Sequence, residues 1–427
     1  MSVHASIRRV ANAQNHGALG VTIVMPCLNE IVSLPHCIAN AQDALAQIKA
    51  RYGLDGEVLI ADNGSTDGSQ QLAEKAGARV VSVTARGYGA ALIGGSHAAQ
   101  GRFLLMGDAD GSYDFTDGVA MIGALMEGAD LCMGSRFKGG IASGAMPWKN
   151  RYIGNPILTG ILNLFFRSGV SDAHCGLRAI TRDAFHELRL SGTGMEFASE
   201  MVIKASLKKL RIAEAPATLS KDLRDRAPHL RPWRDGWRHL RYLLMLSPTW
   251  VFGAPASLAL SLSAFILGVA ILHALHLVPG LGPFGASWTI VAGFLFTTGH
   301  FAAIMAVVGH LYGVQQGYRL LKPSLLKLSR LLTLETWLLT GLLMIAVALS
   351  SLLAVAFHWG AANFVTPVTV LPLVLSAITG TVGFQTIIGA FILAIVRDHE
   401  ARFTELKNGV ESDRMLIPSN SSETIAV

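Results

Sequence analysis

Two aspartates, Asp108 and Asp110, stand one residue apart just after a short apolar run. The run from Phe103 to Met106 predicts a buried strand, and Gly107 lets that strand end abruptly. Both carboxylates then fall at the carboxyl end of a strand, where open α/β sheets bind their ligands. This spacing suits a hard divalent cation, Mg²⁺ or Mn²⁺, that is also held by phosphate groups of a substrate. The alternative is a solvated turn, in which Asp and Gly are common.

The chain around this motif alternates strands with helices. Strands are expected at 21–26, 57–61 and 79–83, and helices at about 31–50 and 90–100. The alternation predicts a mostly parallel sheet with helices on both faces, in which the turns after successive strands gather at one edge. Asp62, Gly87 and Gly89 lie in such turns. The two glycines would let backbone approach a diphosphate, and the helix that starts at Ala90 would direct its N–H groups there.

The composition requires a membrane part. The 427 residues are 51% hydrophobic with a mean hydropathy of +0.43, which is too apolar for one soluble domain, and the long uncharged runs all lie beyond Pro248. Spans long enough to cross about 30 Å of hydrocarbon are expected at roughly 249–272, 287–312, 337–359 and 370–396. The cysteines at 27, 37, 132 and 175 form no metal or redox spacing and are expected to be small buried residues.

Charge sets the expected orientation. The loops 273–286 and 360–369 contain no Lys or Arg, whereas the loop 313–336 carries Arg319, Lys322, Lys327 and Arg330, and the tail begins at Arg397. Residues 1–19 lack an apolar core of signal-peptide length. The globular half, the middle loop and both termini are therefore expected in the cytosol, with the spans in the inner membrane of the cell.

The excess of basic residues is concentrated before the first span. The residues concerned are Arg224, Arg226, Arg231, Arg234, Arg238 and Arg241. At this position we expect them to meet anionic lipid headgroups and not nucleic acid. From 231 to 246 the arginines recur on one helical face, and Trp233, Trp237, Leu240 and Leu244 on another. This pattern predicts an amphipathic helix in the membrane interface; the alternative is a soluble helix that packs its tryptophans into the globular half.

These patterns predict five segments. They are a flexible segment at 1–19, a catalytic α/β domain at 20–222, a basic juxtamembrane helix at 223–247, a four-helix membrane domain at 248–397 and a polar tail at 398–427. Within the spans, His300, His310 and Gln385 are expected to hydrogen-bond between helices, with a path for a lipid as the alternative. Gly380 and Gly383 would let two spans pack closely.

Six ordered motifs resemble one enzyme family. Val-Met-Pro-Cys-Leu-Asn-Glu30, Ala-Asp-Asn-Gly-Ser-Thr-Asp67, Gly-Asp-Ala-Asp110 and Met-Gly-Ser-Arg-Phe137 resemble the motifs of family 2 glycosyltransferases of the GT-A fold. Asn-Arg-Tyr-Ile-Gly-Asn155 and Asp-Ala-His-Cys-Gly-Leu-Arg178 resemble acceptor-side segments of the polyprenyl-phosphate branch, the dolichol-phosphate mannose and glucose synthases. The resemblance runs from about residue 21 to 220. It implies an inverting transfer of one hexose from a nucleotide sugar to a polyprenyl phosphate.

The resemblance also implies site residues. Pro26, Glu30 and Asp62 would line the base and ribose pocket, with Gly87 and Gly89 completing the nucleotide-sugar site. Asp108 and Asp110 would hold the nucleotide and its metal, and Asp108, Asp110 and Arg136 form the catalytic group. The acceptor phosphate would be bound by Arg136, Arg151, Asn155 and Arg178. Departures at Leu28, Asn63, Cys175 and Leu177, where the family often has Tyr, Asp, Ser and Phe, leave the nucleotide and the sugar open.

The chemistry of the acceptor favours this branch. A phosphate monoester is already mostly a dianion at neutral pH, so it needs gathered positive charge and no general base, and arginine's planar fork suits that task. A neutral lipid hydroxyl is the alternative acceptor and requires a carboxylate base. A membrane scaffold or translocator with a degenerate nucleotide domain is the alternative outside enzymes.

Three further residues, His174, Glu196 and Glu200, are candidates for catalytic roles. His174 beside Asp172 suggests an acid/base pair, but shaping of the acceptor loop is favoured. Glu196 and Glu200, spaced i and i+4, indicate mainly ordinary helix pairing with Lys204, and an acceptor-side role for either is the alternative.

Overall fold

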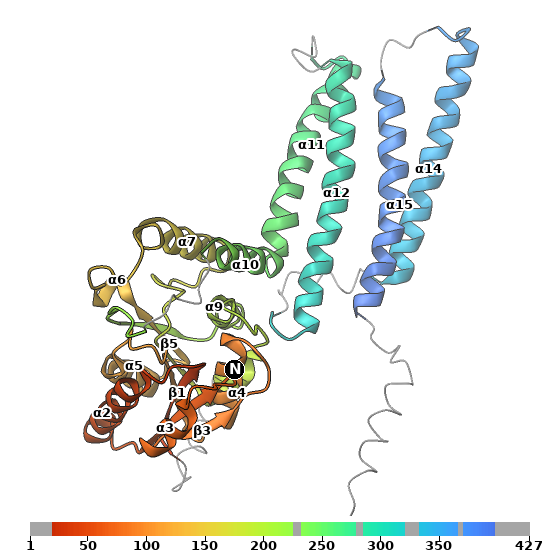
Figure 1. Ribbon diagram of the computed structural model, residues 1–427. Helices are drawn as coiled ribbons and strands as arrows, with labels where there is room; N and C mark the ends of the chain where they lie inside the picture. Colours follow the sequence, from red (N-terminus) through yellow and green to blue (C-terminus); the bar gives the residue numbers. More distant parts are fainter. Residues whose placement is uncertain (1–18, 225–231, 279–284, 321–332, 366–369, 398–427) are drawn as a thin grey trace, which may run out of the picture. The chain divides into compact units, whose positions relative to one another are not determined.

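The computed structural model describes residues 19–224, 232–278, 285–320, 333–365 and 370–397 (Figure 1). It divides the chain into two compact units. One contains the described residues up to Val251 together with Gly317–Leu320, and the other contains Phe252–Gln316 and the described residues from 333 onward. The expected N-terminal segment, apart from Leu19, and the expected tail at 398–427 lie outside the described residues.

The first unit is built on a seven-stranded sheet with the order β3-β2-β1-β4-β6-β5-β7. The strands are β1 (Val21–Cys27), β2 (Gly56–Asp62), β3 (Arg79–Ser82), β4 (Phe103–Met106), β5 (Leu131–Ser135), β6 (Arg178–Thr181) and β7 (Ile212–Pro216). Neighbouring strands are parallel except at β6, which runs antiparallel to both β4 and β5. The expected mostly parallel α/β sheet is therefore confirmed.

Helices cover both faces of this sheet. They are α2 (Leu34–Tyr52), α3 (Ser69–Lys75), α4 (Tyr88–Ala98), α5 (Gly118–Met126), α6 (Arg136–Gly139), α7 (Asn155–Phe166), α8 (Arg182–Leu188), α9 (Phe197–Leu207) and α10 (Pro232–Met245), with helical turns at Phe115–Asp117, Asn150–Gly154 and Thr249–Gly253. In β1, Ile23 and Met25 pack in one buried cluster with α2 and α5, whereas Val24 packs in a second cluster with α4, α8 and α9. This period of two is what a strand buried on both faces requires.

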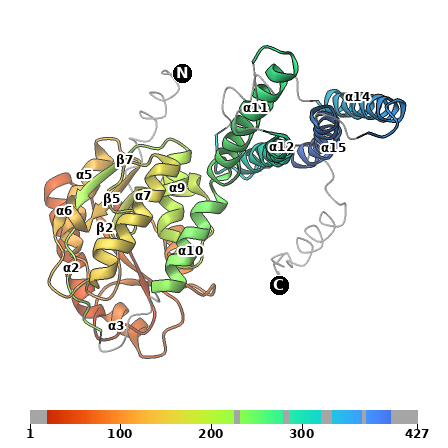
Figure 2. The same ribbon diagram turned by 90° about the horizontal axis from the view of Figure 1, so that it is seen from above.

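Helices α7, α9 and α10 pack side by side on the second face (Figure 2). Leu243 of α10 and Leu246, which directly follows the helix, are buried in the second cluster. The opposite side of α10 carries Arg234, Arg238 and Arg241, all exposed, and Trp237, which is 60% exposed. The expected amphipathic helix is present, and leucines, not Trp237, attach it to the globular unit. Arg226, Arg231 and the side chain of Trp233 lie outside the described residues.

The second unit contains four long apolar helices. They are α11 (Ala254–Ala274), α12 (Ala286–Gln315), α14 (Leu334–Ala361) and α15 (Leu371–Arg397). Each is long and apolar enough to cross a membrane, so the four expected spans are confirmed. α12 packs against both α11 and α15, and α14 packs against α15.

Polar and small residues join the membrane helices as expected. His300 Nδ1 lies 2.9 Å from Gln385 Oε1, which links α12 to α15. Gly341 and Gly383 bring the backbones of α14 and α15 together, since a Cβ added at either glycine would lie within 2.8 Å of the carbonyl oxygen of the other. Small residues that allow such close approach, and hydrogen bonds between helices, hold spans together where water is absent.

The four cysteines are free and buried, as the sequence predicts. Burial raises the pKa of Cys27 to about 11, and the pKa of Cys37, Cys132 and Cys175 to about 12. They remain protonated thiols at neutral pH and behave as small apolar residues.

Candidate active site

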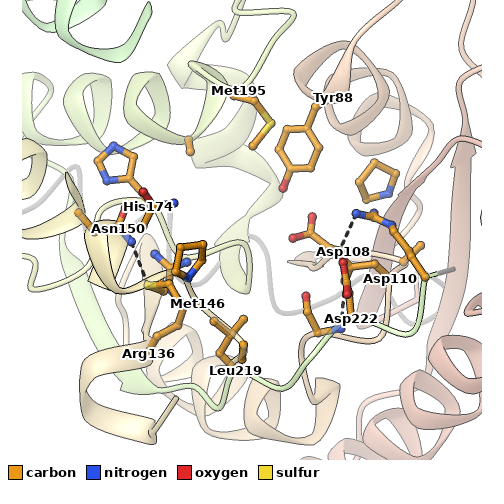
Figure 3. Close-up of a pocket in the computed structure, with 18 of the residues that line it drawn as sticks. Tyr88, Asp108, Asp110, Arg136, Met146, Asn150, His174, Met195, Leu219 and Asp222 are labelled. Atoms are coloured by element: carbon orange, nitrogen blue, oxygen red, sulfur yellow. Dashed lines mark hydrogen bonds and ion pairs between the residues drawn. The ribbon is translucent and has the colours of Figure 1, made fainter. Parts of the chain in front are cut away.

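A cavity of about 1040 Å³ opens at the edge of the sheet where β1, β2, β4 and β5 end. Its walls also include the segment 219–224 and parts of α7, α9 and α10. Figure 3 shows Asp108, Asp110 and Asp222 on one side of it and Arg136, Asn150 and His174 on the other. The topology therefore brings an acidic end and an arginine end into one cavity.

The acidic end follows β4. Gly107 is required there because a Cβ would lie 2.6 Å from the ring of Phe115. Burial raises the pKa of Asp108 to about 6, and the charge of Asp110 adds to this, while the Tyr88 hydroxyl, Arg224 and Arg178 act against it. Asp110 Oδ1 accepts a hydrogen bond of 2.9 Å from the backbone N–H of Ser112. Two carboxylates are thus held close together with little water around them.

This end fits a divalent cation. Asp108 Oδ1 is buried and has no hydrogen-bond partner within the protein, which leaves an acceptor available for a positive ligand. Over the described residues, no three His, Cys, Asp or Glu side chains gather closely enough to hold a metal by themselves. A cation at Asp108 and Asp110 would therefore take further ligands from phosphate or water, as Mg²⁺ commonly does.

Arg224 closes the acidic end, which the sequence did not predict. The segment 219–224 follows the Asp110 turn, with the N–H of Leu223 donating to Asp110 O at 2.8 Å. Arg224 Nε donates to both carboxylate oxygens of Glu30 at 3.0 Å, and Arg224 Nη1 lies 3.2 Å from Asp110 Oδ2. We expected this arginine at lipid headgroups; instead it joins two predicted site carboxylates. Nothing in its sequence position distinguishes it from the other arginines of the basic cluster.

Arg136 forms the other end of the cavity, at the start of α6. Its Nε and Nη2 donate to the two oxygens of Asp172 at 2.7 and 2.8 Å. Asp172 is fully buried and Arg136 is 8% exposed. Burial lowers the pKa of Arg136, but Tyr113 and Asp172 outweigh it and raise that pKa above its ordinary value. The positive charge is therefore permanent and its direction is fixed. Asn150 and Asn155 line the cavity nearby.

The predicted base pocket is only partly formed by the predicted side chains. Pro26 and Glu30 line the cavity, whereas Asp62 does not. The Asp62 carboxylate accepts hydrogen bonds from the N–H groups of Gly64 and Ser65 and from Gln70 Nε2. Asn63, which does line the cavity, donates its amide to Val83 O and Ala85 O. Both residues therefore hold the loops that form the wall.

The start of α4, at Gly87 and Gly89, is in contact with the loop that contains Gly192 and Thr193. A Cβ at Gly89 would lie 2.1 Å from Gly192 O, so a neighbouring loop, not a ligand, requires glycine there. Ala90 N–H donates to Thr193 O at 3.1 Å, and Gly87 N–H donates to Asn63 Oδ1 at 2.8 Å. Two of the N–H groups at this helix start, where we expected a diphosphate, thus have partners within the protein. Gly87 itself lines the cavity.

Two predicted arginines lie outside the cavity lining. Arg178 is 1% exposed, and its guanidinium donates to the carbonyl oxygens of Ala198 and Cys175. It occupies β6, in the interior of the sheet, where it holds α9 against that strand. Arg151 lies half-buried in the turn before α7, with its guanidinium 5.4 Å from the ring of Tyr152. Their assignment to the acceptor phosphate remains a prediction.

Comparison with known proteins identifies the family. The model of "Glycosyl transferase family 2" matches residues 22–189, and that of "Glycosyltransferase family 2 C-terminal transmembrane region" matches 307–397. The low-salt glycan biosynthesis hexosyltransferase Agl6 of Haloferax volcanii is 32% identical over 401 residues, which are 91% of this chain and 92% of the relative. The chain belongs to glycosyltransferase family 2.

Other relatives of this glycosyltransferase are named for transfer to lipid phosphates. The dolichyl-phosphate beta-glucosyltransferase of Saccharomyces cerevisiae is 27% identical over 50% of this chain and 71% of its own length. The polyprenol monophosphomannose synthase of Mycolicibacterium smegmatis is 26% identical over 47% of this chain and 77% of its own. Among solved structures, mannosyl-3-phosphoglycerate synthase from Rubrobacter xylanophilus matches with a TM-score of 0.41 and 21% identity, over 56% of this chain and 75% of its own.

The resemblance on which the sequence analysis depended is therefore confirmed. The catalytic half of the glycosyltransferase has the sheet expected of the GT-A fold, and residues 307–397 of its membrane half match the transmembrane region described for this family. The chain is an enzyme that transfers sugar and a multi-pass membrane protein.

Arg224→Ala is expected to strengthen binding of Mn²⁺ alone. The Arg224 guanidinium shares Asp110 with any cation bound there, and a partly exposed ion pair stabilises by about 1 kcal/mol, so affinity should rise about fivefold. Titration calorimetry of the purified protein without nucleotide measures this. Arg211→Ala, which removes a surface arginine beside Asp130, is the matched control. Weaker Mn²⁺ binding in Arg224→Ala would contradict the competition.

Proposed function

We propose that this glycosyltransferase moves one hexose from a nucleotide sugar to a polyprenyl phosphate at the cytosolic face of the inner membrane. The products are a polyprenyl-phosphate sugar and a nucleoside diphosphate. The observation that carries the proposal is the separation of charge within one cavity: carboxylates for a donor and its cation at one end, and Arg136 at the other. The names of the relatives, which include a hexosyltransferase and dolichyl- and polyprenyl-phosphate enzymes, support the same substrate class.

The arginine end suits an acceptor that is already charged. The carboxylates among the described lining residues are Glu30, Asp108, Asp110 and Asp222. Glu30 and Asp110 are bridged by Arg224, and Figure 3 places Asp108 and Asp222 beside Asp110. All four thus belong to the donor side. A neutral hydroxyl needs a base within hydrogen-bond reach, whereas a phosphate dianion needs a cation, and Arg136 is the residue so placed.

The proposed reaction is a single displacement with inversion. An oxygen of the acceptor phosphate bonds to C1 of the sugar as the bond from C1 to the donor phosphate oxygen breaks, and no proton is transferred. Arg136 orients the acceptor oxygen, and Asp108 and Asp110 would hold Mg²⁺ or Mn²⁺ on the donor side. When bound, that cation supplies positive charge to the departing nucleoside diphosphate. Pro26, Glu30 and the loops held by Asp62 and Asn63 are assigned to the nucleoside.

The outer side of α7 and α10 supports delivery of a lipid acceptor. Large apolar side chains exposed on and beside these helices are Trp148, Tyr152, Ile153, Ile157, Leu164, Trp237, Met245 and Trp250. Arginines 234, 238 and 241 of α10 are exposed with them. Tryptophans next to basic residues are typical of surfaces at the headgroup level of a bilayer. Because the same two helices line the cavity, a phosphate presented by the membrane would meet its arginine end.

Asp110→Ala is expected to reduce sugar transfer by about 10³-fold or more, because it removes a carboxylate from the charge-stabilising end of the site. Asp43→Ala, at an exposed position of α2, is the control. Transfer of labelled sugar to lipid is measured in membranes with equal amounts of each protein. A variant that folds, inserts and transfers at the wild-type rate would exclude the role of Asp110.

The acceptor is tested directly with matched lipids. Membranes containing the enzyme are incubated with labelled UDP-glucose or GDP-mannose, plus undecaprenyl phosphate, dolichyl phosphate, the corresponding free polyprenol or diacylglycerol. We expect a product that mild acid cleaves, formed only with the phosphorylated lipids, because only they supply an anionic nucleophile. Transfer to the free polyprenol or to diacylglycerol would favour a hydroxyl acceptor, and the absence of nucleotide-sugar binding would favour a scaffold.

The orientation is tested by reporter fusions. Alkaline phosphatase fused after His276 or Asn363 should be active, whereas green fluorescent protein fused after Gln316 should fluoresce, because the basic loop is expected in the cytosol. The reverse pattern at all three positions would place the catalytic unit outside the cytosol.

A further inference from the structure

Two histidines and a serine meet in a polar cluster at the arginine end of the cavity, which both histidines line. His174 comes from the turn before β6, Ser199 from α9 and His239 from α10. Ser199 Oγ lies 3.2 Å from His174 Nε2 and 2.8 Å from His239 Nδ1. The two imidazole rings meet edge to face with centroids 4.8 Å apart. Ser199 is fully buried and His239 is 7% exposed, so the contacts are shielded from water.

The serine hydroxyl makes this cluster directional. It has one proton, so it donates to one imidazole nitrogen and accepts from the other. The ring that accepts from Ser199 must turn an unprotonated nitrogen towards it, and the ring that donates to Ser199 must turn an N–H towards it. Burial lowers the pKa of His174 well below its ordinary value, and His239, Arg136 and Arg178 act in the same direction. Hydrogen bonds of defined geometry join the three side chains.

The cluster is connected to Arg136 through Asp172. The backbone N–H of His174 donates to Asp172 Oδ1 at 3.3 Å. Asp172 in turn receives Nε, Nη2 and the backbone N–H of Arg136. His174 and Asp172 belong to one turn, so fixing the His174 ring fixes the carboxylate that directs the guanidinium. Figure 3 shows His174 and Arg136 on the same side of the cavity, opposite Asp108.

We propose that His174, Ser199 and His239 form a positioning cluster that holds the Asp172 turn, and with it Arg136, at the acceptor end of the site. The inference rests on the proposed function, in which Arg136 binds the acceptor phosphate. Ser199 does not line the cavity, whereas His174 and His239 do, so Ser199 acts on substrate only through these two imidazoles. His239 belongs to the amphipathic α10. The cluster therefore couples the packing of that helix to binding of the acceptor and not to binding of the donor.

The two histidines use different ring nitrogens, which gives a sharp test. An asparagine amide reaches about as far from the backbone as Nδ1, and a glutamine amide about as far as Nε2. His239→Asn and His174→Gln should therefore keep the KM for polyprenyl phosphate within about twofold of wild type. His239→Gln, His174→Asn and Ser199→Ala should raise it about fivefold to tenfold or more, since each histidine change loses one buried hydrogen bond and Ser199→Ala loses both. The KM for the nucleotide sugar should not change.

Ser206→Ala is the matched control, because this serine lies on the same helix and donates only to Val202 O. Its kinetic constants should equal those of the wild type. The same preference for Asn or for Gln at both histidines would overturn the proposal, as would an equal rise in the KM for both substrates.

A second measurement keeps the cluster testable if the acceptor is another molecule. Hydrogen exchange in the intact membrane protein should be faster in Ser199→Ala than in wild type for peptides covering 171–177 and 134–139, and unchanged for 21–27. Unchanged exchange around Asp172 would overturn the proposal whatever the enzyme transfers to. Faster exchange together with no transfer to any polyprenyl phosphate would support the cluster and reject the proposed acceptor.

Discussion

The active site is organised by the need to compensate two carboxylates that are held close together away from water. Asp108 and Asp110 repel each other at the end of β4, and burial makes that repulsion stronger than it would be in solvent. The two carboxylates therefore need positive charge close by. In this structure Arg224 supplies part of it and binds Glu30 as well. In the proposed reaction a cation and its diphosphate do so, which makes donor binding a replacement of one set of positive charges by another.

The charge of Arg136, in contrast, is compensated by a fixed partner within the protein. Its partner Asp172 is fully buried and accepts the guanidinium through two oxygens, so the pair has a fixed direction and little freedom to rearrange. A buried pair of this kind contributes little net stability, but breaking it is costly because one charge is left without a partner. The pair therefore fixes the geometry of the guanidinium. In the proposed reaction, the donor side thus has a positive charge that can be exchanged, whereas the positive charge of the acceptor side is permanent. This difference suits a reaction in which the leaving group of the donor gains negative charge, whereas the acceptor phosphate is charged before it binds.

Sequence patterns located the residues whose role follows from their strand. Asp108 and Asp110 come just after an apolar run, so the end of a predicted strand placed them at the ligand-binding edge, whereas Arg136 was assigned from its motif, Met-Gly-Ser-Arg-Phe137. Arg224 was missed because an arginine before an apolar span fits a headgroup as well as a carboxylate, and only the path of 219–224 over the Asp110 turn decides. Gly89 and Arg178 occur in recognisable motifs. In the structure, Gly89 packs closely against Gly192 O, and Arg178 donates hydrogen bonds to backbone carbonyl oxygens. The spans were predictable because hydrophobicity alone determines them; which helices touch depended on pairs such as Gly341 and Gly383.

The reversed strand β6 has a geometric consequence. It lies between β4, which ends at the aspartates, and β5, which ends at Arg136. Neighbouring strands are about 4.8 Å apart, so one intervening strand separates the two ends by roughly 10 Å. A hexose ring with a phosphorus atom on either side needs a gap of this order. Because β6 runs antiparallel to both neighbours, its start and not its end lies at that edge, and the segment that leads into it places Asp172 against Arg136 and His174 in the cavity wall. In the proposed reaction, the spacing of the strands thereby sets the distance between the donor and the acceptor phosphates.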